Sequence, residues 1–537
     1  MFTKMINKAT DFLSGATASL GYGTPYDGAA LGGEVGGNWY TSNNSADNEF
    51  DQSGELLRSR SRSLTRNDPF AVSARDAHTN NVIGSRIKLS AKPDYKLLGI
   101  SPEQSRDWAR QVERKFDLFA NGFRHNVDAK RRGDLAALMR TMDAGIFVDG
   151  EALALVQFDR TAYKRGLKFG TCLQHISIDR LETPDKYSSD RNVRHGIRRN
   201  AMGAPTHYYI RKKHPNETDG LVHAKRYVSA RTSSRMGRPI VLHAFDQPYA
   251  EMSRGVSKFA SAIGSMKMLK NYNKTELQRA VTQASYAAVI KTNLPYEKAM
   301  EVVGSDLDAL KNKLGGNAIT ALGIDHMQQV KGYHSSAGIT MQGARIPHLL
   351  PNEELDIKMG STSNANFPAF EAAFLRQFSA ATGIDFASLS KNYSSLPYAA
   401  ARTALADVWK GYMVARSTVH SQVLQPLFAA WLEEAFLIGE IDLPPGVGDF
   451  YGNWEALARC AFIMSGKPQI DPMKERKAQE LGLDMGVETL ESIAAQDGND
   501  WEERLEQKAV EKGVIKSLKL EDEPEKPAKP GKPAGEV

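Results

Sequence analysis

The longest periodic segment of the chain is PYAAARTALADVWKGYMVARSTVHSQVLQPLFAAWLEEAFLIG, residues 397–439. Apolar side chains recur along it at the spacing of one helix face, which predicts a single long α-helix. At about 1.5 Å per residue, this helix would be on the order of 60 Å long. Pro426 lies inside the segment, but the apolar pattern resumes in phase after it, so we expect a kink and not an end. Few compact enzymes need an element of this length, whereas an elongated ring subunit does.

Two further helices and a polar loop precede this segment. Residues 256–292 and 366–384 carry apolar side chains at helical spacing, and Gly383 is placed to cap the second helix. Residues 293–365 between them are mixed in pattern and rich in glycine, which is typical of a small α/β insertion. The polar stretch 385–396 predicts a loop that leads into the long helix.

The N-terminal half combines an irregular arm with helices and strands. Residues 1–57 are rich in Gly, Ser, Asn and Tyr without any period, which predicts a flexible arm, with order beginning near Arg58. A helix is expected over Pro69–Val82, and Ser101 with Gln104 forms the capping box of the next one. Residues 146–245 change to period-two and β-branched patterns, which indicate a region dominated by strands.

The C-terminal part is expected to contain short helices and a tail. The helices are predicted from Asp471 to Gly482, near 487–496 and over 500–512. Residues 516–537 are expected to be disordered, because they end in a Pro/Lys/Glu-rich stretch that cannot form a core. The predicted fold class is therefore α+β, mainly helical, with one long kinked helix.

Length and composition restrict the class of protein. The 537 residues exceed the size at which one core keeps growing, so several domains are expected. No stretch approaches the roughly 20 continuous apolar residues of a membrane-spanning helix, and the N-terminus lacks the pattern of a signal peptide. Cys172 and Cys460 are the only cysteines, which excludes a disulfide framework and a cysteine-rich zinc site. We therefore expect assembly in a cytoplasmic setting, without a membrane partner.

The net charge of +6 is small, but its distribution is uneven. Residues 191–238, here called the basic block, hold twelve Lys and Arg residues against Glu217 and Asp219. The candidate binding residues of the block are Arg191, Arg194, Arg198, Arg199, Arg211, Lys212 and Lys213. Such a block suits a phosphate backbone. A solvated face or a set of charges at a subunit interface fits equally well.

The sequence contains no motif that carries chemistry. A phosphate-binding G-x-x-x-x-G-K-[ST] loop, H-E-x-x-H and G-x-S-x-G are all absent. Asp149-Gly150-Glu151 places two carboxylates close together, but no other acidic cluster accompanies them, so we interpret it as a turn with solvated acids in preference to a metal site. We assign no catalytic residue, no metal ligand and no cofactor, and we expect the protein not to be an enzyme.

Several short motifs follow one another along the chain. They are Arg58-Ser-Arg60-Ser-Arg62-Ser-Leu64 with Asn67-Asp68-Pro69, Asn80-Asn81-Val82-Ile83-Gly84, Asp149-Gly150-Glu151, Ile178-Asp179-Arg180-Leu181, Ser253-Arg254-Gly255-Val256-Ser257, Thr382-Gly383-Ile384 with Asn392-Tyr393-Ser394-Ser395, and Ile470-Asp471-Pro472-Met473-Lys474-Glu475. In this order and spacing they resemble the lambda-type family of tailed-phage portal proteins. Two positions depart from the family pattern: Asp68 replaces the usual second asparagine, and the motif before Arg254 is only partly kept.

The resemblance implies the wing, stem, clip and crown regions of a portal-type ring subunit. The wing would comprise residues 58–255 and 397–469, the stem helices 256–292 and 366–384, the clip 293–365, and the crown 470–515. Such subunits form a ring, typically of about twelve copies, at one capsid vertex of the virion. The ring nucleates procapsid assembly, and double-stranded DNA is packaged and ejected through it without sequence readout. The implied protein partners are the major capsid protein, the terminase large subunit and a head-completion or tail adaptor protein.

The resemblance also makes residues 385–396 the tunnel loop, which would project into the channel. The expected DNA-facing residues are Ser390, Lys391, Asn392, Tyr393, Ser394 and Ser395. Weak polar contacts and one cation suit a channel in which DNA must slide, because affinity rises steeply with each neutralised phosphate. The alternative is that Lys391 faces solvent or a neighbouring subunit.

For the basic block we favour a role at the subunit interface, since a heterologous ring needs complementary faces. Two other classes of protein are alternatives to this assignment. A nucleic-acid enzyme would need a phosphate loop or an acidic metal cluster, and the sequence shows neither. A head–tail adaptor or a minor head structural protein is the alternative function, but we expect such a protein to be shorter or to lack this order of helices.

Overall fold

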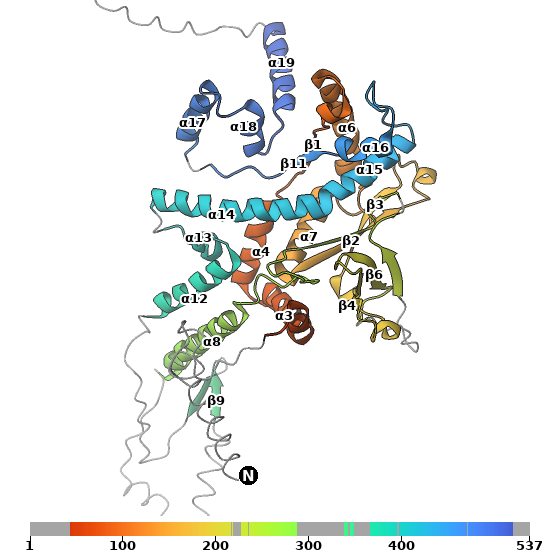
Figure 1. The fold of residues 1–537 in the computed structure, drawn as a ribbon. Helices are drawn as coiled ribbons and strands as arrows, with labels where there is room; N and C mark the ends of the chain where they lie inside the picture. The colour runs from red at the N-terminus through yellow and green to blue at the C-terminus, as the bar shows by residue number, and fades with distance from the viewer. Residues whose placement is uncertain are drawn as a thin grey trace, which may run out of the picture. The chain divides into compact units, whose positions relative to one another are not determined.

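The computed structural model describes residues 43–215, 217, 227–234, 236–286, 338–341, 344–347, 366–394, 397–469 and 471–518 (Figure 1). The chain divides into two compact units. One comprises residues 1–55 and 247–254, and the other comprises residues 56–246 and 255–537. In the described part of the chain, no helix combines the length and the apolar character needed to cross a membrane.

The first described helix, α3 (Ala46–Asn67), begins inside the predicted flexible arm. The prediction that residues 1–57 form this arm is therefore wrong for its last twelve positions. The Ser45 hydroxyl accepts a hydrogen bond from the Asn48 N–H, and Asp47 adds a negative charge in the first turn, where the helix dipole favours it. Asp47 also accepts hydrogen bonds from the N–H and hydroxyl of Ser253, at 2.9 and 2.7 Å. These contacts order the start of the helix.

The helices that follow confirm the capping signals in the sequence. In α4 (Pro69–Val82), the Asp68 carboxylate accepts from the N–H groups of Phe70 and Ala71. In α6 (Pro102–Asn121), Ser101 and Gln104 form the predicted capping box. The short α5 (Tyr95–Leu98) precedes α6, and α7 (Leu135–Asp149) follows it.

The strands form two sheets of more than two strands in the described residues. In the first, β2 (Glu151–Phe158) lies between β3 (Thr171–Ile176) and β8 (Val241–Phe245), and both pairings are antiparallel. The second has the order β4 (Val193–Arg194), β5 (Ile197–Arg199), β6 (Pro205–Arg211) and β7 (Tyr227–Arg231). The strands predicted within 146–245 are thereby confirmed. Short 3₁₀ turns lie between them at Tyr163–Arg165, Ile178–Arg180 and Asp185–Tyr187.

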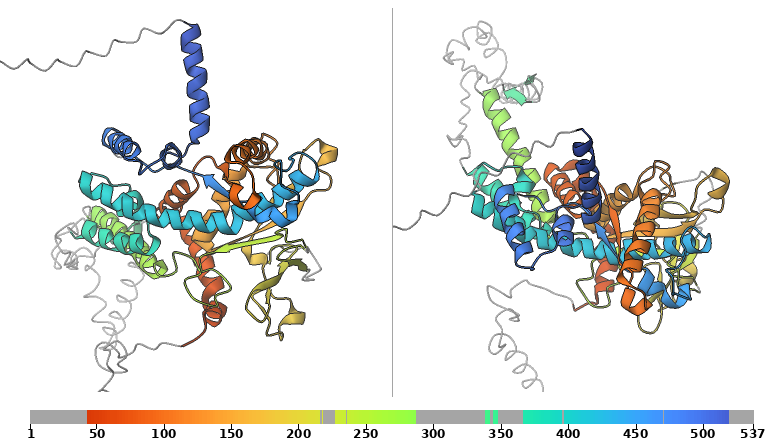
Figure 2. Two further views of the ribbon diagram at one scale, coloured as in Figure 1. Left: turned by 45° about the horizontal axis from the view of Figure 1, so that its top comes forward. Right: turned by 90° about the horizontal axis from the view of Figure 1, so that it is seen from above.

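The segment 397–439 is helical throughout most of its length, in three consecutive pieces. They are α14 (Tyr398–Val419), a π-helical turn η6 (His420–Leu424) and α15 (Gln425–Leu437), which run on from one another in Figures 1 and 2. The irregularity expected at Pro426 thus lies one turn earlier. Pro426 itself falls in the first turn of α15, where the widened turn before it accommodates the missing N–H.

The largest core surrounds this long helix. Trp431 of α15 is fully buried, and its ring centroid lies 5.0 Å from that of Phe116 and 5.3 Å from that of Phe169. The core extends along α4, α6, α7 and the first sheet. A smaller core lies between the two sheets and includes Leu153, Ile197 and Tyr208. The apolar stripe that predicted the helix is therefore the stripe that the molecule buries.

The two predicted stem helices are present with altered bounds. The first, α8 (Ile263–Tyr286), begins seven residues later than the predicted 256, because the chain first turns at Ser257, whose hydroxyl accepts from the Phe259 N–H at 3.1 Å. The second, α12 (Phe367–Thr382), ends at Gly383 in the left-handed conformation, as predicted. The two helices pack together through Tyr272 and Phe367, whose ring centroids are 5.5 Å apart.

Most of the predicted clip, 293–365, lies outside the described residues. Within it, β9 (Gly338–Met341) and β10 (Ala344–Pro347) pair in antiparallel fashion. Farther along the chain, α16 (Phe450–Leu457) is followed by β11 (Cys460–Ile463), which pairs with β1 (Lys88–Ala91).

The C-terminal helices are α17 (Pro472–Asp484), α18 (Leu490–Gln496) and α19 (Trp501–Ser517), close to the predicted positions. Two bounds are corrected. The helix α17 passes Gly482 and ends before Gly486, which has a positive φ of 71°. The predicted tail at 516–537 begins too early, since α19 continues to Ser517. Residues 519–537 lie outside the described residues.

Candidate functional site

The predicted tunnel loop is half helix. Asp385 caps a short helix, α13 (Phe386–Ser390), by accepting from the Ser388 N–H at 2.8 Å. Leu389 is buried to 1% exposure, and the Ser388 carbonyl accepts from the Ser73 hydroxyl of α4 at 3.1 Å. The prediction of a loop over 385–396 is therefore wrong for its first half, because one capping carboxylate and two buried apolar side chains suffice to hold a helical turn against α4.

The exposed tip begins at Lys391. Lys391 adopts the left-handed conformation with φ of 56°, which ends α13 and turns the chain outward. Asn392 accepts hydrogen bonds from the N–H and hydroxyl of Ser394, at 3.1 and 2.6 Å, so the tip forms a compact polar turn. Tyr393 is 58% exposed, and Lys391 is exposed without an ion-pair partner among the described residues. Ser395 lies outside the described residues.

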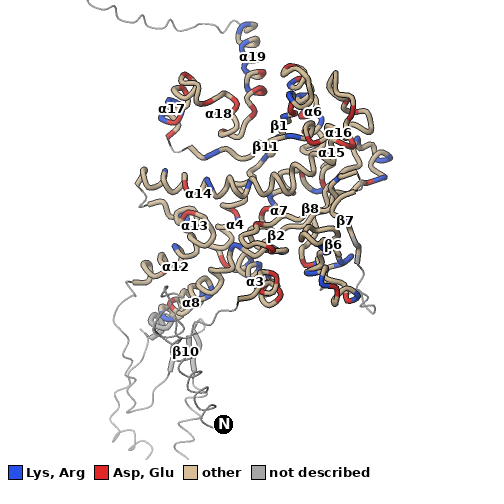
Figure 3. The backbone as a smooth tube through the Cα atoms, viewed as in Figure 1, with Lys and Arg blue, Asp and Glu red and all other residues tan. Residues whose placement is uncertain are grey.

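The second sheet gathers the basic block, and acids partly neutralise it. Arg198 pairs with Asp190 at 2.9 Å, and Arg211 pairs with Glu182 at 3.0 Å. Blue and red segments accordingly lie close together around β4 and β6 in Figure 3. Arg191 and Lys212 are exposed. The block is therefore a mixed surface with exposed cations at its edge.

The other candidate cations lie on or next to the second sheet. Arg194 lies on β4, Arg199 lies on β5, and Lys213 follows the end of β6. Lys225, Arg226 and Arg235 lie outside the described residues.

Three of the motifs quoted from the sequence meet in one cluster of charges. Arg58 pairs with Glu151 at 2.5 Å and with Asp179 at 3.3 Å. Arg62, one helical turn later, pairs with Asp149 at 2.7 Å and with Asp179 at 2.5 Å. The arginine motif of α3, the Asp149-Gly150-Glu151 turn and the Asp179 turn are thereby joined.

Two histidines complete the cluster. The His243 Nε2 atom lies 2.8 Å from a Glu151 carboxylate oxygen, and the His214 Nε2 atom lies 3.1 Å from an Asp179 carboxylate oxygen. Glu151 is 1% exposed. The interpretation of Asp149-Gly150-Glu151 as a turn with solvated acids is therefore wrong: arginines far away in the sequence hold both carboxylates.

Ion pairing favours the charged forms of Arg62 and Asp179 despite their partial burial. Burial works against the charge of Arg62, but the hydrogen bonds and charges of Asp149 and Asp179 raise the pKa of its guanidinium. Burial alone would raise the pKa of the Asp179 carboxyl, whereas Arg62, His214 and Arg58 lower it to about 2. The carboxylates thus face arginine side chains. Among the described residues, no group of three or more His, Cys, Asp and Glu side chains is placed so that it could hold a metal ion.

Two glycines bring this cluster against the start of the chain that leads to α8. Gly150 has a positive φ of 93°, and a Cβ atom there would lie 2.4 Å from the carbonyl carbon of Val256. A Cβ atom on Gly255 would lie 2.0 Å from the Gly150 carbonyl oxygen. The two backbones can approach this closely only without side chains. The i, i+4 spacing of Arg58 and Arg62 was the sequence signal that could have predicted the cluster, since it places both cations on one helix face.

In this protein, charged motifs join segments that are far apart in the sequence. A sequence model of the family described as phage portal protein, lambda family, matches residues 33–416. The chain therefore belongs to the lambda family of phage portal proteins. It is a portal protein of a tailed phage and a component of the virion.

Named relatives agree with this assignment. The chain is 29% identical to the portal protein of Escherichia phage N15 and 27% identical to portal protein B of Escherichia phage lambda, in each case over 90% of this chain and 88% of the relative. The probable portal protein of Halomonas phage phiHAP-1 is 21% identical, over 85% of this chain and 79% of the relative.

Among solved structures, a chain in the neck of a native GTA particle is similar at 11% identity and a TM-score of 0.38, over 81% of this chain and 91% of that one. A chain in the neck of an empty GTA particle has 12% identity and a TM-score of 0.40, over 81% of this chain and 95% of that one.

Proposed function

We propose that the protein forms a ring of about twelve copies at one capsid vertex, and that double-stranded DNA is packaged and ejected through the ring. The observation that carries this proposal is the family match over residues 33–416, which includes the first wing segment, both stem helices and the tunnel loop. In this role the protein has no catalytic residue and needs no cofactor.

The tip of the tunnel loop supports a channel that does not grip DNA. A sliding duplex must not be bound tightly, because each neutralised phosphate adds to affinity. The described tip offers hydroxyl and amide groups and one cation, Lys391, in a turn that α13 anchors to α4. Repeated around a ring, Lys391 would provide a circle of single charges that steadies the backbone without reading bases.

The proposed protein partners follow from the family role. The major capsid protein would surround the ring, whose assembly nucleates the procapsid. The terminase large subunit, and later a head-completion or tail adaptor protein, would dock on the clip, residues 293–365. The basic block would join neighbouring subunits, because a heterologous ring brings two different faces together.

The ring is tested by native mass spectrometry with negative-stain imaging. We expect a species of about twelve copies and ring-shaped particles with a central hole. A monomer or dimer at every salt concentration would contradict the proposal and favour a head–tail adaptor.

The tunnel loop is tested by Lys391→Ala. Because the exposed Lys391 side chain makes no described ion pair, we expect intact rings of normal mass and a loss of DNA packaging or retention, measured as the DNA content of purified heads. Lys164→Ala, an exposed lysine of the turn at Tyr163–Arg165, is the matched control and should package normally. Normal packaging by Lys391→Ala would remove the channel-facing role of this loop.

A further inference from the structure

The C-terminal helices α17, α18 and α19 share very little core with the rest of their unit. Neither α17 nor α19 has a buried side chain among the described residues, and Ile493 and Ala494 of α18 belong to neither of the two described cores. Burial of apolar surface is the main source of cohesion within a domain. Interactions other than apolar packing must therefore hold α17, α18 and α19 in place.

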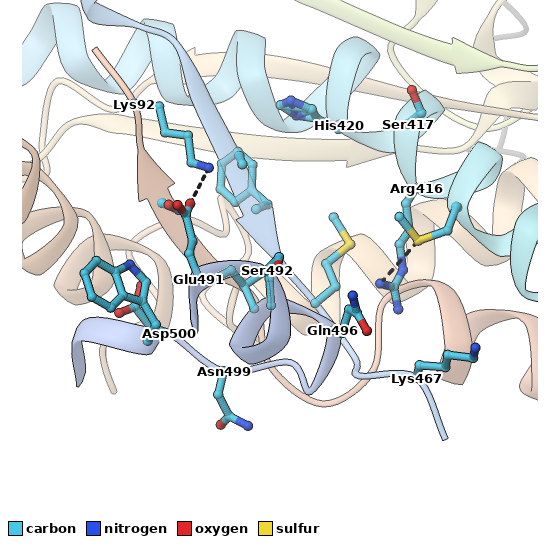
Figure 4. Close-up of a pocket in the computed structure, with 18 of the residues that line it drawn as sticks. Lys92, Arg416, Ser417, His420, Lys467, Glu491, Ser492, Gln496, Asn499 and Asp500 are labelled. Carbon is cyan, nitrogen blue, oxygen red and sulfur yellow. Dashed lines mark hydrogen bonds and ion pairs between the residues drawn. The ribbon is translucent and has the colours of Figure 1, made fainter. Parts of the chain in front are cut away.

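A cavity separates them from the long helix. It has a volume of about 550 Å³ and is lined by Trp409 and Met413 of α14, by Phe462 of β11, and by Ala495 and Trp501 of the C-terminal helices. Figure 4 shows Arg416, Ser417 and His420 of the long helix on one side and Glu491, Ser492 and Gln496 of α18 on the other. A cavity of this size means that apolar packing contributes little across this boundary.

Ion pairs bridge the boundary instead. Lys88 of β1 pairs with Glu503, and Lys92, directly after β1, pairs with Glu491 at 2.5 Å. The cations of these pairs come from β1, the residue directly after it and α6, and the acids come from α18 and α19.

On α6, Arg110 pairs with Glu502 at 2.6 Å and with Glu506 at 3.8 Å, and Arg114 pairs with Glu506 at 3.7 Å. Arg110 and Arg114 are spaced i, i+4, as are Glu502 and Glu506, so two charged helix faces oppose each other.

The C-terminal helices are also tied to one another. The Asp497 carboxylate, 9% exposed, accepts from Gln469 at 3.1 Å, from Arg476 of α17 at 2.9 Å and from Arg504 of α19 at 3.2 Å. The Lys467 N–H, in the segment that follows β11, donates to the Gln496 carbonyl at 2.8 Å and so connects that segment to α18. Asp497 directly follows α18, so its carboxylate connects α18 with α17 and α19.

We propose that α17–α19 form one body, and that the ion pairs of Lys88, Lys92, Arg110 and Arg114 with Glu491, Glu502, Glu503 and Glu506 are a salt-sensitive latch that holds it over the cavity. Exposed ion pairs contribute little individually, and mobile ions screen them, with a Debye length of about 10 Å at 0.1 M salt and about 3 Å at 1 M. A latch of such pairs opens as ionic strength rises. This inference concerns one subunit and does not depend on the proposed channel.

Glu113 of α6 makes the strength of the latch depend on pH. Burial raises the pKa of its carboxyl to about 7, with the hydrogen bond from the Ala91 N–H opposing the shift and the charges of Asp500, Glu502 and Glu503 adding to it. Arg110 and Lys88 are the cations that pair with the same acids. When the C-terminal helices are held in place, the protonated form of the Glu113 carboxyl is favoured. The stabilisation of the closed latch by this proton is lost as pH rises through about 7, so the latch is tighter at pH 6 than at pH 8.

Zero-length crosslinking tests the latch in the full chain. A carbodiimide joins a lysine amine to a contacting carboxylate as an amide, with loss of water, and peptide mass spectrometry counts the products. We expect Lys88–Glu503 and Lys92–Glu491 crosslinks in 50 mM salt, and a decrease of about threefold or more in 500 mM salt. The internal control is the Lys258–Asp246 pair, which is 2.7 Å apart and lies outside the latch, and all yields are expressed against it.

Charge exchange separates a latch from a folding defect. Arg110→Glu should lower both crosslinks in 50 mM salt, and the double variant Arg110→Glu with Glu502→Arg should restore them. Glu113→Gln should remove the difference between pH 6 and pH 8. Yields that follow the Lys258–Asp246 control under every salt condition and in Arg110→Glu would overturn the proposal, as would crosslinks that join two chains.

Discussion

Glu151 shows at the scale of single residues how this protein uses its charged motifs. It is 1% exposed and contacts Arg58 at 2.5 Å and His243 at 2.8 Å. A buried ion pair contributes little compared with a well-packed apolar pair, but removing one partner leaves a buried charge without compensation. The motif therefore acts as a structural joint between α3, the first sheet and the turn at Asp179.

Neutralising Glu151 should destabilise the fold strongly. Glu151→Gln keeps the size of the side chain and leaves the buried Arg58 charge with a weaker partner, so we expect the free energy of unfolding to fall by about 3–5 kcal/mol. The midpoint of urea denaturation measures this change. The control is Asp246→Asn, which breaks an exposed pair with Lys258 and should cost no more than about 1 kcal/mol. Equal losses in both variants would contradict the buried role of Glu151.

The glycine contact beside this cluster leads to a second prediction. Gly150→Ala places a methyl group within van der Waals overlap of the Val256 backbone at a positive φ, so we expect a lower thermal midpoint and less soluble protein. Gly411→Ala is the matched control, because no atom lies within 4 Å of its Cβ position in α14. It should raise stability by about 0.5–1 kcal/mol through helix propensity. Tolerance of Gly150→Ala would mean that the two backbones can separate.

At the scale of secondary-structure elements, the sequence correctly predicted the features that depend on residues close together in the chain. The capping residues Asp68 and Ser101 and the left-handed Gly383 lie where the sequence placed them. The apolar stripe of 397–439 likewise predicted the helices that line the core. Each of these signals acts within a few residues of the chain, so a single sequence contains it in full.

The elements that the sequence missed depend on distant contacts. The early start of α3 is supported by Ser253, and α13 is held against α4 by Ser73 and the buried Leu389. The π-helical turn at His420–Leu424 has no local sequence signature in this chain. The charge cluster was also missed, because Arg58 and Glu151 are far apart in sequence and only the fold makes them neighbours. No periodicity or capping rule contains that information.

The anchoring of α13 gives a prediction at this scale. Leu389→Ala removes a side chain that is 1% exposed, so we expect a loss of about 2–5 kcal/mol in the free energy of unfolding, together with reduced DNA packaging because the tip at Lys391 loses its support. Tyr393→Ala changes a side chain of the same segment that is 58% exposed and should alter stability by less than about 0.5 kcal/mol. Urea denaturation of both variants, with the DNA content of heads, checks the prediction. An unstable Tyr393→Ala would show that the tip packs against the protein.

At the scale of the whole molecule, the family assignment and the physical pattern agree for different reasons. The family assignment rests on a match over residues 33–416, whereas the long helix, the helices α8 and α12 and the C-terminal helices were predicted from periodicity and caps. Neither source determines which faces meet in a ring. The basic block offers a direct test of one such face, since Arg191 and Lys212 are exposed and could contact an acidic partner or a phosphate.

Reversing the charge of Arg191 and Lys212 distinguishes these two partners. If the basic block joins subunits, Arg191→Glu with Lys212→Glu places like charges at a heterologous contact, and rings should dissociate at a lower protein concentration and reassemble as salt screens the repulsion. If the block contacts DNA, rings should keep their mass while the DNA content of heads falls. Native mass spectrometry at 50 and 500 mM salt, with Lys164→Glu as the exposed control, separates the outcomes. Because acids already pair with Arg198 and Arg211, which reduces attraction for a polyanion, we expect the first result.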